Sequence, residues 1–271
     1  MKDVGYLESP YRLNQLEHHY GDKVHIVTNP VLATLLARLC AVETRQPQVN
    51  RLVRRLYEDL VVSVVNDLFP RRVVELETRM VADTPRARYE SELIDTSVKA
   101  ISVDIARAGI LPSLVCYEML NELLVPDNVR QDHLMISRST DDMDHVKGAR
   151  ITGGKIGGSI DGAVVLFPDP MGATGSSLSE AISYYKEEYG RNARALATLN
   201  LIITPEFIKR IRQDHPEVRI YALRLDRGMS PDDVLQEVPG ARWDEESGLN
   251  DKDYIVPGGG GFGEIMNNAW V

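Results

Sequence analysis

Cysteine is scarce in this chain of 271 residues, which has only Cys40 and Cys116. The two are far apart in the sequence and do not have the spacing of a metal site. A disulfide would require the fold to bring them together, so we expect two buried free thiols, as in a reducing compartment. The cytoplasm is therefore the expected location.

Long apolar runs are also missing. No stretch approaches the roughly 20 apolar residues that a membrane-spanning helix needs. The N-terminal 20 residues carry Lys2, Asp3, Glu8, Arg12 and Glu17 without an apolar core, so we do not expect a signal peptide here. We expect no membrane association.

A basic excess is absent as well, because the formal net charge is −9. General nucleic-acid binders carry a positive excess, so nucleic acid is not an expected partner. An anionic small molecule stays possible, since it needs only a few local Arg, Lys and backbone N–H donors.

The apolar pattern predicts an α/β fold. Residues 1–24 form an N-terminal extension, helices follow from Pro30 and over 48–68, and residues 71–95 form a hairpin arm. Strands and helices then alternate, with strands at 100–103, 133–137, 163–167, 193–203 and 218–226, and helices at 112–124, 176–189 and 205–215. This alternation predicts one domain over 1–271, with a mainly parallel sheet covered by helices on both faces.

Residues 139–162 interrupt the alternation. They are polar and rich in glycine, and they include Asp141, Asp142 and Asp144. A long loop inside a compact domain usually has a function, so we expect a mobile lid here.

The most informative segment is 163–177, where an apolar strand ends in Asp169, a loop of small residues follows, and an amphipathic helix begins. Glycines let a backbone approach a phosphate closely, and the N–H groups at a helix N-terminus attract anions. A carboxylate at the strand end suits a sugar diol or a hydrated metal. The alternative is an ordinary strand–turn–helix junction with a capping hydroxyl. A Walker loop is excluded, because no Gly-Lys-Ser/Thr follows the glycine.

Residues 169–177 read Asp-Pro-Met-Gly-Ala-Thr-Gly-Ser-Ser. They resemble the phosphate loop Asp-Pro-Met-Leu-Ala-Thr-Gly-Gly-Ser of the uracil-specific branch of type I phosphoribosyltransferases. Seven of the nine positions agree, and Gly172 and Ser176 differ. Further similar stretches follow the family's order, at 29–32, 105–109, 137–141, 204–206 with 215–218, and 248–250 with 254–258.

The resemblance covers residues 25–265 and implies the type I phosphoribosyltransferase fold, with a mainly parallel sheet flanked by helices, a hairpin arm and a C-terminal hood at 248–271. It implies transfer of ribose 5-phosphate from phosphoribosyl pyrophosphate to uracil, giving UMP and pyrophosphate in pyrimidine salvage. It also implies a Mg²⁺ ion that arrives with the donor, without direct ligation by side chains. Family members self-associate, so a homodimer or a higher homo-oligomer is expected.

The same resemblance assigns roles to residues. Arg107 and Arg138 would meet the pyrophosphate, and Asp169 the ribose hydroxyls. The 5-phosphate would lie on Met171, Gly172, Ala173, Thr174, Gly175, Ser176 and Ser177, and the base on Ile255, Gly260, Gly261 and Phe262. The alternative for Arg107 is a surface arginine paired with a neighbouring acid, and Lys155 could either reach the pyrophosphate or face water. The three loop aspartates could assist the metal, but we expect them to face water.

Some positions depart from the family pattern. Gly261 stands where the family has Asp, Phe262 where it has Ala, and Val62-Ser63-Val64-Val65 where it has Tyr-Glu-Ala-Thr. Residues 227–247 form an insertion. Three hypotheses therefore stay open: transfer to uracil, the same chemistry on another base or small acceptor, and a non-catalytic nucleotide-binding relative with a regulatory role. The glycine run 258–263 is not a dinucleotide fingerprint, because too few residues follow it for a helix and a strand.

Overall fold

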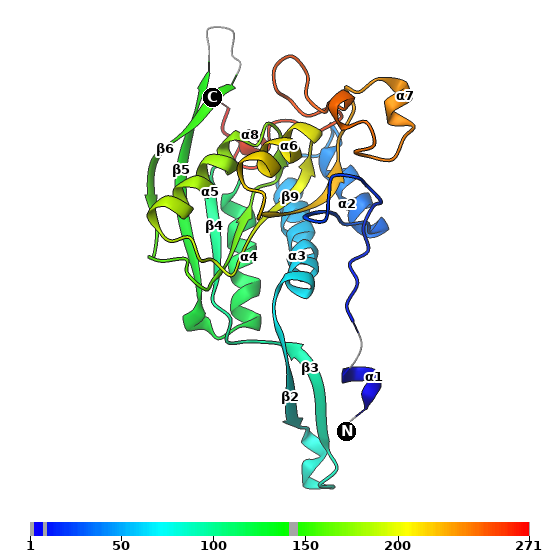
Figure 1. The fold of residues 1–271 in the computed structure, drawn as a ribbon, viewed down its shortest axis with the longest axis vertical. Helices are drawn as coiled ribbons and strands as arrows, with labels where there is room; N and C mark the ends of the chain where they lie inside the picture. The colour runs from blue at the N-terminus through cyan, green and yellow to red at the C-terminus, as the bar shows by residue number, and fades with distance from the viewer. Residues whose placement is uncertain (1–2, 8–9, 141–145, 271) are drawn as a thin grey trace.

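The computed structural model describes residues 3–7, 10–140 and 146–270, without the side chains of 138–140 and 146–149 (Figure 1). Its main sheet has the strand order β1-β10-β9-β7-β4-β5-β6, and β8 pairs with β9. All neighbours are parallel except β5 and β6. The strands are β1 (Val24–Ile26), β4 (Ala100–Ala106), β5 (Val129–Thr140), β6 (Val146–Lys155), β7 (Val164–Pro168), β8 (Met171–Gly172), β9 (Ala195–Ile203) and β10 (Arg219–Leu225). The predicted mainly parallel sheet is confirmed.

Helices cover both faces of this sheet, because successive strand side chains point to opposite sides. In β7, Val164 and Leu166 face one apolar cluster, which includes buried residues of α2, α3 and α4. Val165 and Phe167 face a second cluster, with α5 and α6. The helices are α2 (Pro30–Cys40), α3 (Gln48–Leu68), α4 (Ile110–Leu123), α5 (Ser176–Glu188) and α6 (Pro205–Asp214).

Helix α2 begins at Pro30 and α3 spans residues 48–68, as the sequence predicts. The Asn29 side chain accepts hydrogen bonds from Val31 N and Leu32 N, so it caps α2, and Pro30 occupies the first turn. Helix α3 buries the apolar face that contains Leu52, Leu56, Leu60 and Val64, and it ends before Pro70.

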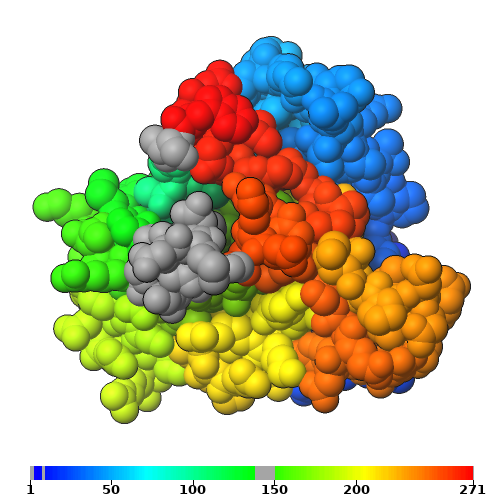
Figure 2. All heavy atoms as spheres, turned by 90° about the horizontal axis from the view of Figure 1, so that it is seen from above, coloured from blue at the N-terminus to red at the C-terminus, as the bar shows by residue number. Residues whose placement is uncertain are grey.

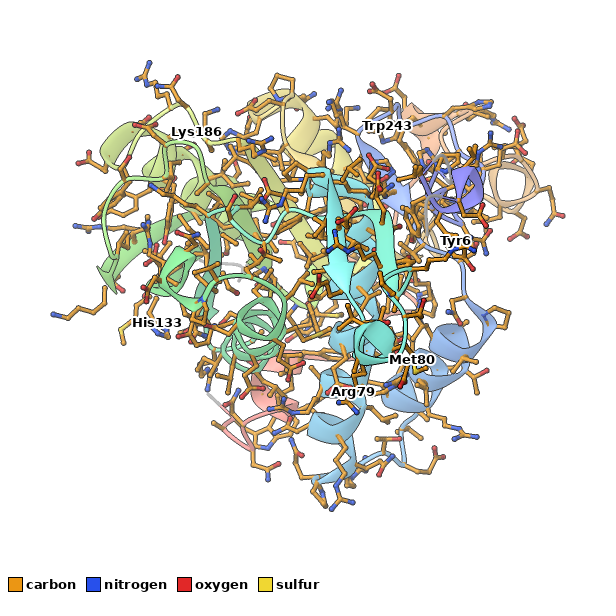
Figure 3. The ribbon with its side chains drawn as sticks, turned by 90° about the horizontal axis from the view of Figure 1, so that it is seen from below. Tyr6, Arg79, Met80, His133, Lys186 and Trp243 are labelled. Atoms are coloured by element: carbon orange, nitrogen blue, oxygen red, sulfur yellow. The ribbon has the colours of Figure 1, made fainter. Side chains whose placement is uncertain are left out.

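The arm is a β-hairpin, as predicted. Strand β2 (Arg71–Glu77) pairs in antiparallel register with β3 (Arg88–Ile94), and the 3₁₀ turn η1 (Arg79–Ala82) lies between them. The hairpin extends away from the main sheet, with α1 (Val4–Leu7) beside it (Figure 1). Arg79 and Met80 lie near its tip (Figure 3).

The loop predicted over 139–162 is wrong at residues 139–140 and 146–155, which are strands. Strand β5 continues to Thr140, and residues 146–155 return as β6, so the segment is an antiparallel ribbon. A Cβ atom at Gly154 would lie 2.9 Å from His133 O, so this glycine serves close approach between strands. Asp141, Asp142 and Asp144 lie outside the described residues.

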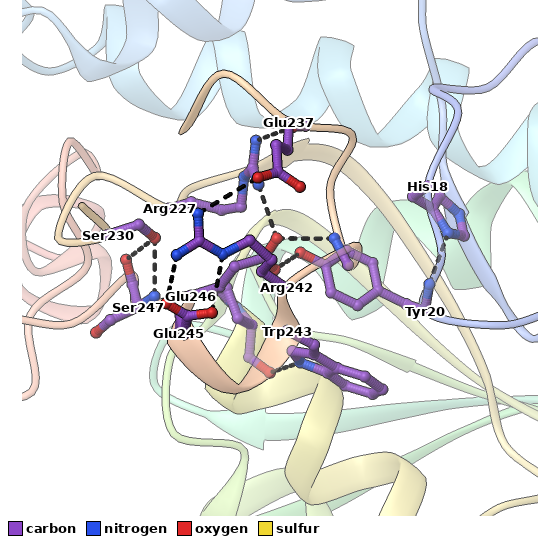
Figure 4. A network of polar contacts seen from close by, with 12 residues as sticks. His18, Tyr20, Arg227, Ser230, Glu237, Arg242, Trp243, Glu245, Glu246 and Ser247 are labelled. Carbon is purple, nitrogen blue, oxygen red and sulfur yellow. Dashed lines mark hydrogen bonds and ion pairs between the residues drawn. The ribbon is translucent and has the colours of Figure 1, made fainter. Parts of the chain in front are cut away.

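The predicted insertion, 227–247, leaves and rejoins the fold at one place. Met229 N donates to Ser247 O at 3.0 Å, and α7 (Asp232–Leu235) and η3 (Trp243–Glu245) lie in between. Buried Glu246 accepts hydrogen bonds from Tyr20 Oη, Arg227 Nη1 and Gly240 N (Figure 4). The insertion therefore packs against the N-terminal extension, and the buried carboxylate of Glu246 joins the two through hydrogen bonds.

Candidate active site

The predicted site residues meet at one edge of the main sheet. Strands β4 and β7 are neighbours, but the chain runs from β4 to β5 on one side and from β7 to β9 and β10 on the other. Open α/β sheets bind ligands at the carboxyl ends of strands where the order reverses in this way. Arg107 follows β4, Arg138 lies near the end of β5, and Asp169 follows β7. Figure 2 looks onto this edge, with the C-terminal segment in red beside the N-terminal helices in blue.

The carbonyl groups of the phosphate loop, residues 169–173, accept hydrogen bonds from residues at the end of β9 and the start of α6. The hydrogen bonds run from Asn200 Nδ2 to Asp169 O (2.7 Å), from Leu201 N and Ile202 N to Pro170 O (both 3.1 Å), from Thr204 N to Gly172 O (3.1 Å) and from Thr204 Oγ1 to Ala173 O (2.7 Å). In a trans peptide the N–H points opposite to the carbonyl. The amide of Thr174 therefore points away from β9, and the amides that begin α5 have no partner within their helix. This arrangement presents N–H groups and a helix N-terminus to an anion.

Two glycines are required by this loop. A Cβ atom at Gly172 would lie 2.9 Å from both Ile203 Cγ2 and the Phe207 ring, so the leucine of the resembled family would not fit here. Gly175 has φ 79° and precedes α5, a left-handed conformation that suits glycine. Beside it, Thr174 Oγ1 and Ser176 Oγ lie 3.0 Å apart.

Asp169 is half-buried and held in place by the loop. Its Oδ1 accepts a hydrogen bond from Met171 N at 3.0 Å, and its own N donates to Leu199 O at 3.0 Å. Tyr57 Oη donates to the same Leu199 carbonyl at 3.0 Å. Burial first, and then the Asp169 charge, raise the pKa of Tyr57 well above its usual value, so this phenol remains a neutral donor.

Arg107 lies between the end of β4 and the C-terminal segment. Its Nη1 donates to Ala269 O at 3.0 Å, and its Nη2 lies 3.6 Å from Glu264 Oε1. The Ala106–Arg107 peptide is cis. Gly109 packs the turn against β7, since a Cβ atom there would lie 3.2 Å from Pro168 O. Arg107 therefore pairs with an acid, as in the surface-arginine alternative, but this acid is Glu264 of the predicted hood.

Arg138 is placed by its backbone, which pairs with Ala149 in the β5–β6 ribbon. Its side chain lies outside the described ones. Lys155 pairs with His133, five residues before Arg138. His133 in turn pairs with Asp104, two residues before the end of β4, which is roughly 7 Å along the strand. A contact between Lys155 and the pyrophosphate stays a prediction.

The hood is anchored by carboxylates that the sequence reading missed. Glu206 accepts hydrogen bonds from Gly248 N (3.0 Å) and Ser247 Oγ (2.7 Å). Asp226 Oδ2 accepts from Gly258 N at 2.8 Å, and both oxygens of Asp226 bind Arg224 at 2.6 and 2.7 Å. The sequence analysis also did not identify Asn200 and Thr204, which donate hydrogen bonds to the carbonyls of the phosphate loop. The available signal was polar residues within or directly after apolar strands, such as Asn200 between Leu199 and Leu201.

The predicted base-binding residues divide into two kinds. Ile255 and Phe262 are 8% and 2% exposed, and both side chains belong to the apolar core. Any contact of these two residues with a base would therefore use their backbone groups. Gly260 is exposed with φ 85°, and Gly261 is half-buried.

Among the described residues, no group of three or more His, Cys, Asp or Glu could cage a metal ion. A Mg²⁺ ion that is held mainly by substrate phosphates and water fits this donor set, because Mg²⁺ commonly binds proteins in that way.

Both cysteines are free thiols; Cys116 is buried and Cys40 is half-buried. In the described part of the chain, no helix combines the length and apolar character needed to cross a membrane.

Known proteins are similar to this chain in sequence or in fold. The sequence model of the uracil phosphoribosyltransferase family matches residues 25–241. A uracil phosphoribosyltransferase of Agrobacterium fabrum is 30% identical over 245 residues, which are 90% of this chain and 98% of that protein. A uracil phosphoribosyltransferase of Caldanaerobacter subterraneus is 28% identical over 90% of this chain and 97% of that protein. The solved structure of the AQ2163 protein from Aquifex aeolicus covers 92% of this chain and 99% of its own, with a TM-score of 0.67 and 20% identity.

The fold and the site together define a phosphoribosyltransferase of type I. Within that class, the chain belongs to the uracil phosphoribosyltransferase family.

Proposed function

We propose that this protein transfers ribose 5-phosphate from phosphoribosyl pyrophosphate to uracil, releasing pyrophosphate and UMP for pyrimidine salvage. The observation that carries the proposal is the phosphate loop, whose carbonyls are bound by β9 and Thr204, so that the Thr174 amide points away from β9. Family membership supports the same activity.

The chemistry requires positioning more than proton transfer. As pyrophosphate leaves, positive charge develops on the ribose and negative charge on the leaving group. The amides of 172–177 and the N-terminus of α5 hold the 5-phosphate, and Asp169 accepts hydrogen bonds from the ribose hydroxyls. Arg107 and Arg138 bind the pyrophosphate. A Mg²⁺ ion bound with the donor would add positive charge there.

The base is read by the hood in this proposal. The backbone of Gly260 and Gly261 approaches a flat ring, and backbone groups of Ile255 and Phe262 provide donors and acceptors. Buried Phe262 contacts the core, so its size does not itself narrow the base site.

Self-association and location are further parts of the proposal. The arm exposes Val73, Leu76 and Met80 at 60%, 49% and 55%, and we propose that it contacts a second copy of the chain in a homodimer or higher homo-oligomer. Light scattering of the purified chain tests this. The two free thiols support a location in the cytoplasm.

The test of function is release of pyrophosphate from phosphoribosyl pyrophosphate and Mg²⁺ with a panel of bases. We expect release with uracil. Release only with another base would change the acceptor, and no release with any base would leave the regulatory alternative.

A further inference from the structure

The short helix α8 (Phe262–Ile265) of the hood has one face in the core and one toward the site. Phe262 and Met266 are 2% and 5% exposed and belong to the same core cluster, as residues four apart on a helix do. Glu264 lies midway between them, so it projects from another face, where its Oε1 is 3.6 Å from Arg107 Nη2.

The Glu264 carboxylate fills the space beside Gly261. A Cβ atom added at Gly261 would overlap Glu264 Oε2. The backbone of Gly261, with φ −78° and ψ 95°, is open to any residue type. The obstacle to a side chain at this position is therefore the carboxylate of Glu264.

The pair between Glu264 and Arg107 does little to hold the fold together. The two side chains are 32% and 36% exposed, and ion pairs with that much solvent around them add little stability. Its geometric effect is larger, because Arg107 is held from two directions, by Glu264 and by Ala269 O at 3.0 Å. A guanidinium held in this way loses less rotamer freedom when a diphosphate binds.

We propose that Glu264 is a positioning residue for donor binding: it provides, from one helical turn further on, the carboxylate that position 261 lacks, and it orients Arg107 toward the diphosphate. The inference rests on the proposed function for the identity of the donor. Glu264 acts through Arg107, and no covalent step is assigned to it.

The test compares Glu264→Gln, Glu264→Ala and Glu264→Asp with the double variant Gly261→Asp/Glu264→Ala. Glu43→Gln serves as the matched control, because Glu43 is exposed in the loop after α2. The measurements are KM and kcat for phosphoribosyl pyrophosphate, KM for uracil, and the donor Kd by titration calorimetry without a base.

We expect Glu264→Ala and Glu264→Gln to raise donor KM and Kd about tenfold, because an unrestrained Arg107 loses more rotamer freedom when the diphosphate binds, with much smaller changes in kcat and uracil KM. Glu264→Asp should keep part of the affinity. The double variant should regain most of it, because the new carboxylate occupies the vacated space. Gly261→Asp alone should lower the Tm, since two carboxylates would share one site.

An unchanged donor KM and Kd in Glu264→Ala and Glu264→Gln would overturn the proposal. So would a double variant no better than Glu264→Ala. If the wild-type chain releases no pyrophosphate but binds the donor, the calorimetric series still tests Glu264, and only the proposed catalysis fails. A wild-type chain that does not bind the donor overturns both.

Discussion

Thr204 is the residue whose replacement tests the phosphate loop most directly. Its Oγ1 donates to Ala173 O at 2.7 Å and accepts from Phe207 N at 3.0 Å, as the N-cap of α6. Thr204→Val keeps the shape of the side chain and removes both hydrogen bonds. Thr204→Ser keeps both.

The expected loss of stability follows from these two bonds. Loss of an N-cap costs about 1 kcal/mol, and a carbonyl left without its partner costs about 1–3 kcal/mol. Thr204→Val should therefore destabilise the fold by about 2–4 kcal/mol, which lowers the Tm by roughly 5–10 °C in a domain of this size.

Function should respond separately from stability. Without its clamp, the Ala173 carbonyl is free to turn, and the Thr174 amide then no longer points to the phosphate. Losing most of one charge-assisted hydrogen bond raises the donor KM about tenfold. Pyrophosphate release, measured well below the Tm of each variant, gives this KM. The reasoning is refuted if Thr204→Val shows the donor KM of the wild type, or if Thr204→Ser is as impaired as Thr204→Val.

The remaining predictions concern other parts of the site and the fold. Asp169→Asn and Arg107→Ala should each abolish pyrophosphate release while circular dichroism shows a folded chain; normal turnover in either would remove that residue from the site. Gly172→Ala should destabilise by about 1–3 kcal/mol through overpacking against Phe207, measured by urea unfolding, and a smaller residue at 207 should relieve this loss. Burial lowers the pKa of His215 below 6.5, so the unfolded chain takes up a proton before the folded one does. Stability should then fall as pH drops below about 6.5, and His215→Gln should weaken this dependence between pH 7 and 5; an unchanged slope would contradict it.

The sequence alone determined the elements that depend on local pattern. The bounds of α3 were predicted over 48–68 because its apolar face has helical spacing and Pro70 ends it. The strand, loop and helix around Asp169 were predicted because small residues follow a buried strand. The arm was predicted from weak alternation and a turn signal, and it is a hairpin.

The tertiary structure decided what depends on contacts between distant segments. Residues 146–155 have the composition of a loop, yet they form β6, because pairing with β5 satisfies their backbone groups. The sequence could not reveal that Asn200 and Thr204 hold the carbonyls of a loop some thirty residues earlier. Nor could it show that Glu264 lies against Gly261 and Arg107, since only the packing of α8 on the core sets that direction. Local propensity is encoded in neighbouring residues, whereas the orientation of a side chain toward a site is set by the packing of the whole fold.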